Sequence, residues 1–398
     1  MNKKISLGAA IAFMVVLAGI TFCITMMVSL NYFNTMVLNV KNREEMYKKI
    51  ADLDREVRQN FDGTIDEEAL LNSISAGYVK GIGDKYSTYL TKEQYEERLK
   101  DLSGKSVGIG VTVAKDDSGY LLIKKVLAES PAKIANLEVG DYIVSINDTD
   151  LKTLSYDNAV RLIKGDAGSK LKLVYRRNGV DTPIDIIRKD ITIPYVEMQI
   201  LDKNAVIKIT DFNEKTPSQF IDAVNKAIKG GATGLIFDLR DNGGGTVNSV
   251  IEMLDFLLPN GDLGYKIDNT GKKTVLGTSD KHQISMPMVA LVNSKTASAS
   301  ELFVSTLRDI NKTSIVGVNT YGKGVMQSLI KLTDGSAINV TTAHFFPPSG
   351  QKINGVGIKP EYEVKLKPEL ETNLISIKPE QDTQLQKALE VLNSKKAK

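Results

Sequence analysis

TGLIFDLRDNGGG, residues 233–245, and PMVALVNSKTASASELFVSTLRDI, residues 287–310, each begin with a short apolar run and continue into a polar turn. Apolar runs of this length, bounded by turn residues, predict buried strands. AVIKIT (205–210) and TSIVG (313–317) have the same character, and helical patterns follow at 217–229, 247–258 and up to 310. Alternation of strands and helices predicts an α/β core with mostly parallel strands over residues 191–366.

Ligands of such cores bind at the carboxyl ends of the strands. Two loops leave predicted strands at that end, residues 240–245 and residues 293–298. The first is rich in glycine and the second is rich in hydroxyl groups. No Gly-Lys-Ser/Thr follows the glycines, which argues against a phosphate-binding loop. We therefore expect the functional site where these two loops meet.

Thr296, Ser298 and Ser300 are the candidate nucleophiles in the second loop. Ser298 and Glu301 also match a capping box, in which both side chains bond the first amides of a helix. The functional interpretation uses the same position, because free amides at a helix N-terminus stabilise an oxyanion. The segment by itself leaves both interpretations open.

A nucleophilic serine needs a base, and the chain has only two histidines, His282 and His344. Lysine is the alternative, provided that burial lowers its pKa enough to leave the amine neutral. Lys323 stands in YGKG directly after the strand 313–317, and no acidic residue lies between Asn311 and Lys331. The competing interpretation is an ordinary loop lysine exposed to solvent.

Residues 105–190 resemble a PDZ domain in their order of strands, helices and glycine turns. PDZ domains bind a peptide as an added strand, and the amides of a glycine loop hold its terminal carboxylate. The matching loop here contains Gly108, Ile109 and Gly110, with a helix near 155–164 as the opposite wall. The alternative is that these glycines only permit a turn.

The N-terminal residues 1–30 contain two lysines and then an uncharged apolar run from about residue 5. The run is longer than most signal peptides, so we expect an uncleaved signal anchor that crosses the cell membrane once, with the catalytic part outside the cytoplasm. A cleaved export signal is the alternative. Residues 31–104 have a helical pattern, which fits a spacer or a dimerisation arm. Residues 367–398 form a charged helical tail or dimer contact.

Composition excludes several classes of function. The net charge is only +3 in 398 residues, which argues against a nucleic-acid partner. Cys23 is the only cysteine, and it lies inside the apolar run, so cysteine-based metal sites are excluded elsewhere. We expect neither a metal nor a cofactor.

DLRDNGGG, TASASE, YGKGVMQ and FPPSGQKINGVGIKP occur here in the order and spacing of the carboxy-terminal processing protease family, which the chain resembles over residues 40–365. The resemblance implies a crotonase/Clp-protease-like α/β protease core with an inserted PDZ domain and an N-terminal helical region. It implies a serine endopeptidase that processes exported proteins whose free C-termini bind the PDZ domain, and it implies a homodimer.

The resemblance also implies roles for single residues. Ser298 matches the family's nucleophile, Lys323 its base and Gln327 the residue that orients this lysine, which requires a helical turn between the last two. Glu301 matches a supporting glutamate. The amides of Gly244 and Ala299 are the candidates for the oxyanion hole, although Gly243 replaces the family's usual proline, and Asp241 its usual asparagine.

Two rival functions remain from the sequence. One is a membrane-anchored PDZ scaffold whose protease core is inactive, which labelling of Ser298 by a fluorophosphonate would exclude. The other is an enzyme of acyl-CoA chemistry, because the repeating strand–helix pattern also suits a crotonase-like fold. The PDZ module and the exported position argue against the second.

Overall fold

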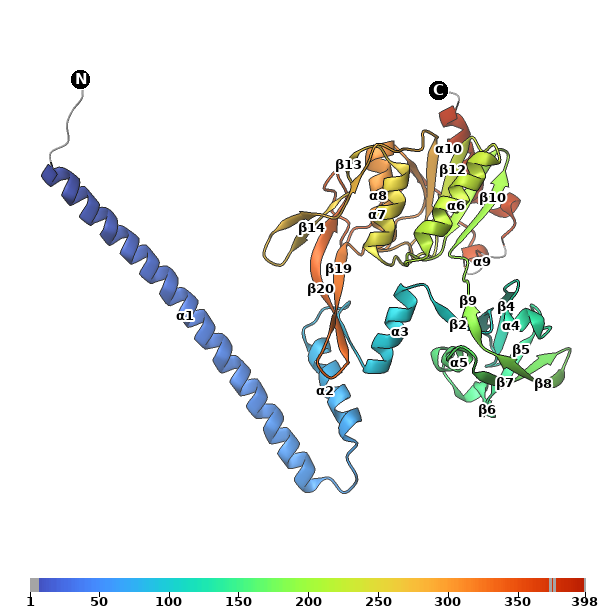
Figure 1. The fold of residues 1–398 in the computed structure, drawn as a ribbon, viewed down its shortest axis with the longest axis horizontal. Helices are drawn as coiled ribbons and strands as arrows, with labels where there is room; N and C mark the ends of the chain where they lie inside the picture. Colours follow the sequence, from blue (N-terminus) through green and yellow to red (C-terminus); the bar gives the residue numbers. More distant parts are fainter. Residues whose placement is uncertain (1–6, 372–373, 375–376, 397–398) are drawn as a thin grey trace. The chain divides into compact units, whose positions relative to one another are not determined.

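The computed structural model describes residues 7–371, 374 and 377–396. Its internal contacts divide the chain into two compact units, Met1–Leu71 and Asn72–Lys398. Figure 1 labels the helices and strands of both. The second unit contains a small β domain and an α/β core, so it carries every predicted site residue.

One long helix, α1 (Leu7–Asn60), makes up most of the first unit. It contains a 20-residue stretch, Ile11–Leu30, with a mean hydropathy of 2.5. This length and apolarity are enough to cross a bilayer, and a signal sequence near an N-terminus has the same properties. Further along, Arg58 pairs with Asp54 and with Glu67 at the start of the next helix. The charged residues 43–60 of α1 therefore favour an aqueous environment.

The helical pattern of residues 31–104 is interrupted by a strand that the sequence did not predict. β1 (Thr88–Leu90) lies between α2 (Glu67–Gly81) and α3 (Lys92–Leu102). It pairs antiparallel with β20 (Ala337–Phe346), which belongs to the α/β core. Three residues carry too little periodicity to reveal a strand, and the pairing depends on a partner about 250 residues away.

Residues 106–191 form the predicted PDZ module. A β-sheet in the order β3-β4-β5-β7-β8, with β6 paired to β5, encloses a core of apolar side chains together with helices α4 and α5. Serine residues cap both helices, Ser130 before α4 and Ser155 before α5. The bounds are β2 Ser106–Gly108, β3 Val111–Lys115, β4 Leu121–Val126, α4 Pro131–Ile134, β5 Tyr142–Ile146, β6 Thr149–Asp150, η1 Leu151–Thr153, α5 Tyr156–Ile163, β7 Lys170–Arg177, β8 Val180–Ile187 and β9 Lys189–Ile191.

The core sheet has the strand order β10-β11-β12-β17-β18-β21, and every pair except β10–β11 is parallel. All residues of β12 and β17 are buried, as expected for strands covered on both faces. The predicted strands and helices of the α/β core are thus confirmed within one or two residues. The bounds are β10 Val196–Leu201, β11 Asn204–Ile209, α6 Thr216–Lys229, β12 Gly234–Asp238, α7 Val247–Leu257, β17 Met288–Val292, α8 Ala299–Asn311, β18 Ser314–Gly317 and β21 Tyr362–Glu363.

Helices cover both faces of this sheet (Figure 1). α6, α7 and α8 pack on one face, where Phe212, Phe220, Phe237 and Phe303 stack edge to face or tilted with ring centroids 5.5–6.1 Å apart. The alternate strand residues point to the other face, which α10 (Thr383–Lys396) covers. The aromatic cluster fixes the start of α8 relative to β12.

The C-terminal helix is part of the core, which the sequence did not decide. Leu385, Leu389 and Leu392 of α10 are at most 8% exposed and pack on the sheet. Their thin apolar stripe therefore covers the chain's own sheet and is not an open tail surface.

A second, antiparallel sheet lies beside the core in the order β1-β20-β14-β15, with β19 paired to β20. The loop 318–324 connects β18 to β19 and so carries Lys323 from the parallel sheet to this second sheet. The remaining bounds are β13 Gly261–Asp262, β14 Tyr265–Asp268, β15 Lys273–Val275, β16 Thr278–Ser279, β19 Val325–Lys331, α9 Pro368–Glu371 and η3 Pro379–Gln381.

Candidate active site

The two loops that follow β12 and β17 contact each other, as their position in the sequence predicted. β12 and β17 are parallel neighbours, so both loops leave the same edge of the sheet. Asn242 carries the junction: its carbonyl oxygen accepts hydrogen bonds from Ala297 N–H at 3.1 Å and from Ser300 Oγ at 3.0 Å. Ser300 is buried in this contact, so its hydroxyl has a structural role.

Ser298 is held in an unusual backbone conformation at the start of α8. Its φ is 58° and its ψ is −121°, a region that residues with a side chain rarely adopt. Such strain is typical of nucleophiles on sharp turns between a strand and a helix. Ser298 also occupies the N-cap position of the predicted capping box. The N-cap residue and the candidate nucleophile are therefore the same residue, and the two interpretations are compatible.

The glycine loop packs directly against this turn. Gly244 has φ 107°, and a Cβ atom on it would lie 2.8 Å from the carbonyl oxygen of Ala297 and 3.0 Å from the nitrogen of Ala299. The Gly244 N–H donates to Asn242 Oδ1 at 2.9 Å. Among the described residues no acceptor is found for the Ala299 N–H. Of the two predicted oxyanion amides, that of Ala299 is the available one in this structure.

Glu301 connects the serine turn to the lysine loop. Its Oε2 accepts hydrogen bonds from the backbone N–H of Ser298 and of Lys323, each at 2.8 Å. The two nitrogens are therefore at most twice 2.8 Å, or 5.6 Å, apart. Oε1 accepts from the Thr320 hydroxyl at 2.5 Å and from Gly322 N–H at 2.8 Å. One carboxylate thus brings the two predicted catalytic residues together through their backbones.

Burial raises the pKa of Glu301, and these hydrogen bonds act in the opposite direction because they favour the charged form. The Glu301 side chain is completely buried. All four of its donors carry a hydrogen that needs an acceptor, so a carboxylate suits this position better than an amide does.

Lys323 lies in a partly buried environment. Burial lowers the pKa of its amine, the positive charge of Arg98 lowers it further, and Asp84 acts in the opposite direction. Its Nζ lies 4.9 Å from the centroid of the Tyr86 ring. Asp84 and Tyr86 lie between α2 and α3, and Arg98 lies within α3, so this part of the chain shapes the electrostatic surroundings of the lysine.

Gln327 does not contact Lys323 in this structure. The sequence required a helical turn between them, but residues 325–331 form the strand β19, with a register irregularity between Met326 and Gln327. Within the described part of the chain, the Gln327 amide donates to Thr341 Oγ1 at 3.1 Å and has no hydrogen bond to Lys323. Pairing with β20 keeps this segment extended, which separates residues four positions apart.

The predicted PDZ loop lies at the start of the β domain. Gly108 ends β2, Gly110 has φ 79°, and the Ile109 side chain is completely buried in the apolar core of the module. Ile109 therefore anchors the loop by its side chain and can offer a ligand only its backbone. These residues line one cavity together with Val160 and Ile163 of α5, the wall predicted opposite the loop.

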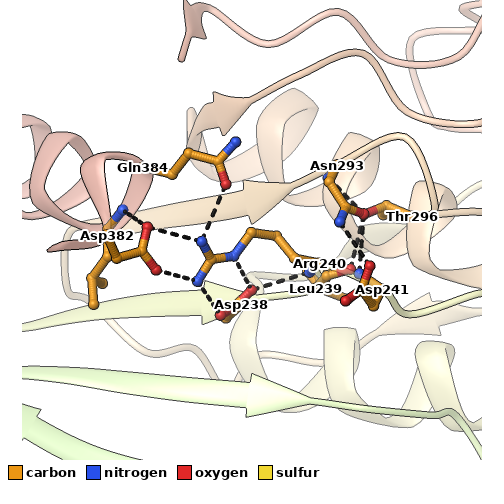
Figure 2. A network of polar contacts seen from close by, with 9 residues as sticks. Asp238, Leu239, Arg240, Asp241, Asn293, Thr296, Asp382 and Gln384 are labelled. Carbon is orange, nitrogen blue, oxygen red and sulfur yellow. Dashed lines mark hydrogen bonds and ion pairs between the residues drawn. The ribbon is translucent and has the colours of Figure 1, made fainter. Parts of the chain in front are cut away.

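Sequence reasoning missed Thr320, Tyr86, Arg98 and the ion-pair cluster behind the glycine loop. That cluster consists of Asp238, Arg240 and Asp382, with Gln384 beside it (Figure 2). Asp238 and Arg240 stand two positions apart in the sequence, but nothing there indicated their partner Asp382, more than 100 residues further on.

Comparisons with known proteins agree with this geometry. A PDZ domain model matches residues 98–176, and a model of peptidase family S41 matches residues 203–364. The carboxy-terminal processing protease CtpA of Bacillus subtilis (strain 168) is 32% identical over 342 residues, covering 84% of this chain and 72% of that protein.

A probable CtpA-like serine protease of Staphylococcus aureus (strain COL) is 31% identical over 327 residues, and the match covers 81% of this chain and 66% of that protein. The chain thus spans just under two thirds of the staphylococcal relative. A solved Bacteroides fragilis (NCTC 9343) structure assigned to the S41 proteases is 18% identical, with a TM-score of 0.53 over 80% of this chain and 90% of that one. It shows the same fold.

The identity to CtpA and its coverage of both chains establish the family, and the two family models locate its two modules. The chain therefore belongs to peptidase family S41, the carboxy-terminal processing proteases, and is a serine-type peptidase that carries a PDZ domain.

Proposed function

We propose that this peptidase hydrolyses peptide bonds with Ser298 as the nucleophile and Lys323 as the general base. One observation carries the proposal: a single buried carboxylate oxygen of Glu301 accepts the backbone N–H of both residues. The strained backbone of Ser298 and the partly buried amine of Lys323 support it, because strain presents a nucleophile and burial favours a neutral amine.

The proposed reaction has two halves. The neutral amine of Lys323 takes the proton from Ser298 Oγ as this oxygen attacks the peptide carbonyl carbon. The carbonyl oxygen becomes an oxyanion and accepts hydrogen bonds from Ala299 N–H and from the glycine loop. The C–N bond then breaks, the ammonium of Lys323 protonates the leaving amine, and an ester to Ser298 remains. Water attacks the ester and gives one proton to Lys323, which returns it to Ser298 as the acid product leaves.

Two of the proposed helpers must change partners before they act. Gly244 N–H joins the oxyanion hole when it exchanges Asn242 Oδ1 for the substrate oxygen. Gln327 orients Lys323 when it releases Thr341 Oγ1. We assign both changes to the substrate-bound state.

We propose further that the PDZ loop with Gly108, Ile109 and Gly110 binds the free C-terminus of exported protein substrates. The apolar stretch Ile11–Leu30 would anchor the enzyme by a single crossing, with the catalytic unit outside the cytoplasm. Because α10 covers the chain's own sheet, a homodimer would use the helical arm of residues 41–100, which light scattering tests.

The decisive experiment is Ser298→Ala. We expect it to abolish both peptide hydrolysis and labelling by a fluorophosphonate, because among the residues that the structure describes no other serine or threonine has a positive φ. Ser294→Ala, an exposed serine of the same loop, is the matched control and should leave both unchanged. If the Ser298→Ala protein still hydrolyses peptides, a different nucleophile acts and the proposal is wrong.

A further inference from the structure

Arg240 directly precedes the glycine loop, but its side chain turns away from the active site. It is 5% exposed and lies inside the cluster of Asp238, Arg240, Asp382 and Gln384, which we call the arginine cluster (Figure 2). Asp382 immediately precedes α10, and Gln384 lies in the first turn of that helix. The end of β12 and the start of α10 therefore meet at one guanidinium.

Every N–H of this guanidinium has a partner. Nε and one terminal nitrogen donate to the two oxygens of Asp238 at 2.9 and 2.7 Å. The terminal nitrogens also contact Asp382 Oδ1 at 3.0 Å and Oδ2 at 2.8 Å, and one of them reaches Gln384 Oε1 at 3.1 Å. Four of these contacts are hydrogen bonds and the fifth is an ion pair, and together they hold the planar guanidinium from three sides.

Two buried carboxylates share this single cation. Burial would raise the pKa of Asp238, but the charge and hydrogen bonds of Arg240 outweigh burial and lower it. Asp382 uses its Oδ1 also to accept Leu385 N–H in the first turn of α10 at 3.0 Å. The arginine cluster thus ties the backbone of α10 to the backbone of β12.

The connection continues into the active site without a gap. Asp241 N–H donates to Asn293 Oδ1 at 3.0 Å, and the Asn293 amide donates to Asp241 Oδ1 at 2.9 Å (Figure 2). Asn242 then bonds the turn that carries Ser298, through Ala297 N–H. Only Asp241 separates the clamped Arg240 from Asn242, which bonds the Ser298 turn.

Resting on the proposed function, we propose that Asp382 is a positioning residue for the glycine loop. By clamping Arg240 it holds residues 241–245 against the Ser298 turn, so that the start of α10 forms part of the catalytic machinery. Gln384 has the same role to a smaller extent, because it supplies one of the five contacts.

The test uses the full chain and two readouts. Asp382→Asn removes the charge while keeping the size of the side chain, and Gln384→Ala removes one contact. Leu389→Ala is the matched control, because Leu389 packs α10 on the sheet and lies outside the arginine cluster. Glu390→Ala, at an exposed position of α10 outside the arginine cluster, controls for the substitution itself. Hydrogen exchange of the peptide that spans residues 239–246 and the rate of fluorophosphonate labelling are measured well below the Tm of each variant.

We expect Asp382→Asn to speed exchange in residues 239–246 and to slow labelling at least about tenfold. This is less than the about 10²- to 10³-fold loss that follows deletion of an oxyanion donor, because the variant loosens the loop and deletes no donor. Leu389→Ala should leave both within about twofold even where it lowers the Tm equally, because it removes packing without releasing Arg240. Hydrolysis should show the loss in kcat and not in KM, because the loop acts on the transition state.

The inference is overturned if Asp382→Asn leaves exchange of this loop unchanged, or if Leu389→Ala changes it as much. If Asp382→Asn does not fold, Gln384→Ala takes its place in the comparison with Leu389→Ala. We then expect a smaller increase in exchange of residues 239–246 and a smaller decrease in the labelling rate. Hydrogen exchange can be measured on a protein without activity. If the wild-type protein fails to label, the proposed chemistry is refuted, and the exchange rates still test whether α10 is coupled to the glycine loop.

Discussion

Glu301 shows how one side chain organises the candidate site at the scale of single residues. Its two oxygens accept four hydrogen bonds, from Ser298, Thr320, Gly322 and Lys323. Three of the donors are backbone amides, so the carboxylate fixes main-chain positions and leaves the Ser298 hydroxyl and the Lys323 amine available for chemistry. Glu301 is therefore a positioning residue in the proposed mechanism.

The state of Lys323 sets the first prediction at this scale. Burial lowers the pKa of Lys323 below the ordinary lysine value of 10.5. The neutral amine is the active form, so kcat/KM should rise with pH to a plateau and fall as the pH drops through the Lys323 pKa. Lys323→Ala should lower kcat by about 10²- to 10⁴-fold, the usual contribution of a general base.

The charge of Arg98 allows a sharper form of this test. Arg98 lowers the pKa of Lys323, so Arg98→Gln should raise that pKa and move the rising limb of the pH profile to higher pH. Arg98 is exposed, hence the shift should shrink as salt is added. Lys100→Gln on the same helix is the control. If the rising limb of the pH profile of kcat/KM stays at the same pH in Arg98→Gln, the assignment of Lys323 as the titrating base is contradicted.

At the scale of elements, the glycine loop and the start of α8 form one packed unit. Gly244 is the closest contact, since a Cβ on it would lie 2.9 Å from Ser298 Cβ. Its φ of 107° also disfavours any residue with a side chain. Loop and helix are supplied by adjacent parallel strands, which is why elements 50 residues apart in the sequence reach the same point.

Gly244→Ala tests this unit. The added methyl group must push the loop away from the Ser298 turn, so we expect kcat to fall by about 10²-fold and the stability to drop by about 1–3 kcal/mol. Gly243→Ala is the matched control, because a Cβ there meets nothing within 4 Å and its φ is not in the left-handed region. Thermal unfolding and kcat are measured on both variants. If Gly244→Ala is as active as Gly243→Ala, the close approach of Gly244 to the Ser298 turn is not needed for activity.

At the scale of the whole molecule, the chain separates a long N-terminal helix from a unit that holds both the PDZ domain and the catalytic core. The stretch Ile11–Leu30 is not buried by the rest of the protein. Nothing in the catalytic residues described above depends on it.

Removal of residues 1–42 should therefore release the enzyme from the membrane fraction and leave kcat/KM for a short peptide within about twofold, because every proposed catalytic residue lies in the second unit. The measurements are fractionation and peptide hydrolysis, with the full chain as the control. If the full chain is already soluble and its mature N-terminus lies beyond residue 30, the segment is a cleaved export signal and the anchor is ruled out.

Much of this organisation follows from the sequence alone. Buried strands such as 288–292 are recognisable because they are uniformly apolar, and the helices because apolar residues recur at helical spacing. Ser298 and Lys323 were candidates from short motifs, and the resemblance to a protease family, not the motifs by themselves, assigned their proposed roles. Local patterns of this kind depend only on neighbours along the chain.

Tertiary structure alone decided the contacts between distant residues. The pairing of Arg240 with Asp382 joins residues 142 positions apart, and α10 was recognisable as a helix but not as the cover of the sheet. The conformation before Gln327 also depended on a partner, because pairing with β20 makes the chain from Val325 onward a strand. Burial, pKa shifts and hydrogen bonds of this kind depend on which segments the fold places together, and no local pattern encodes that.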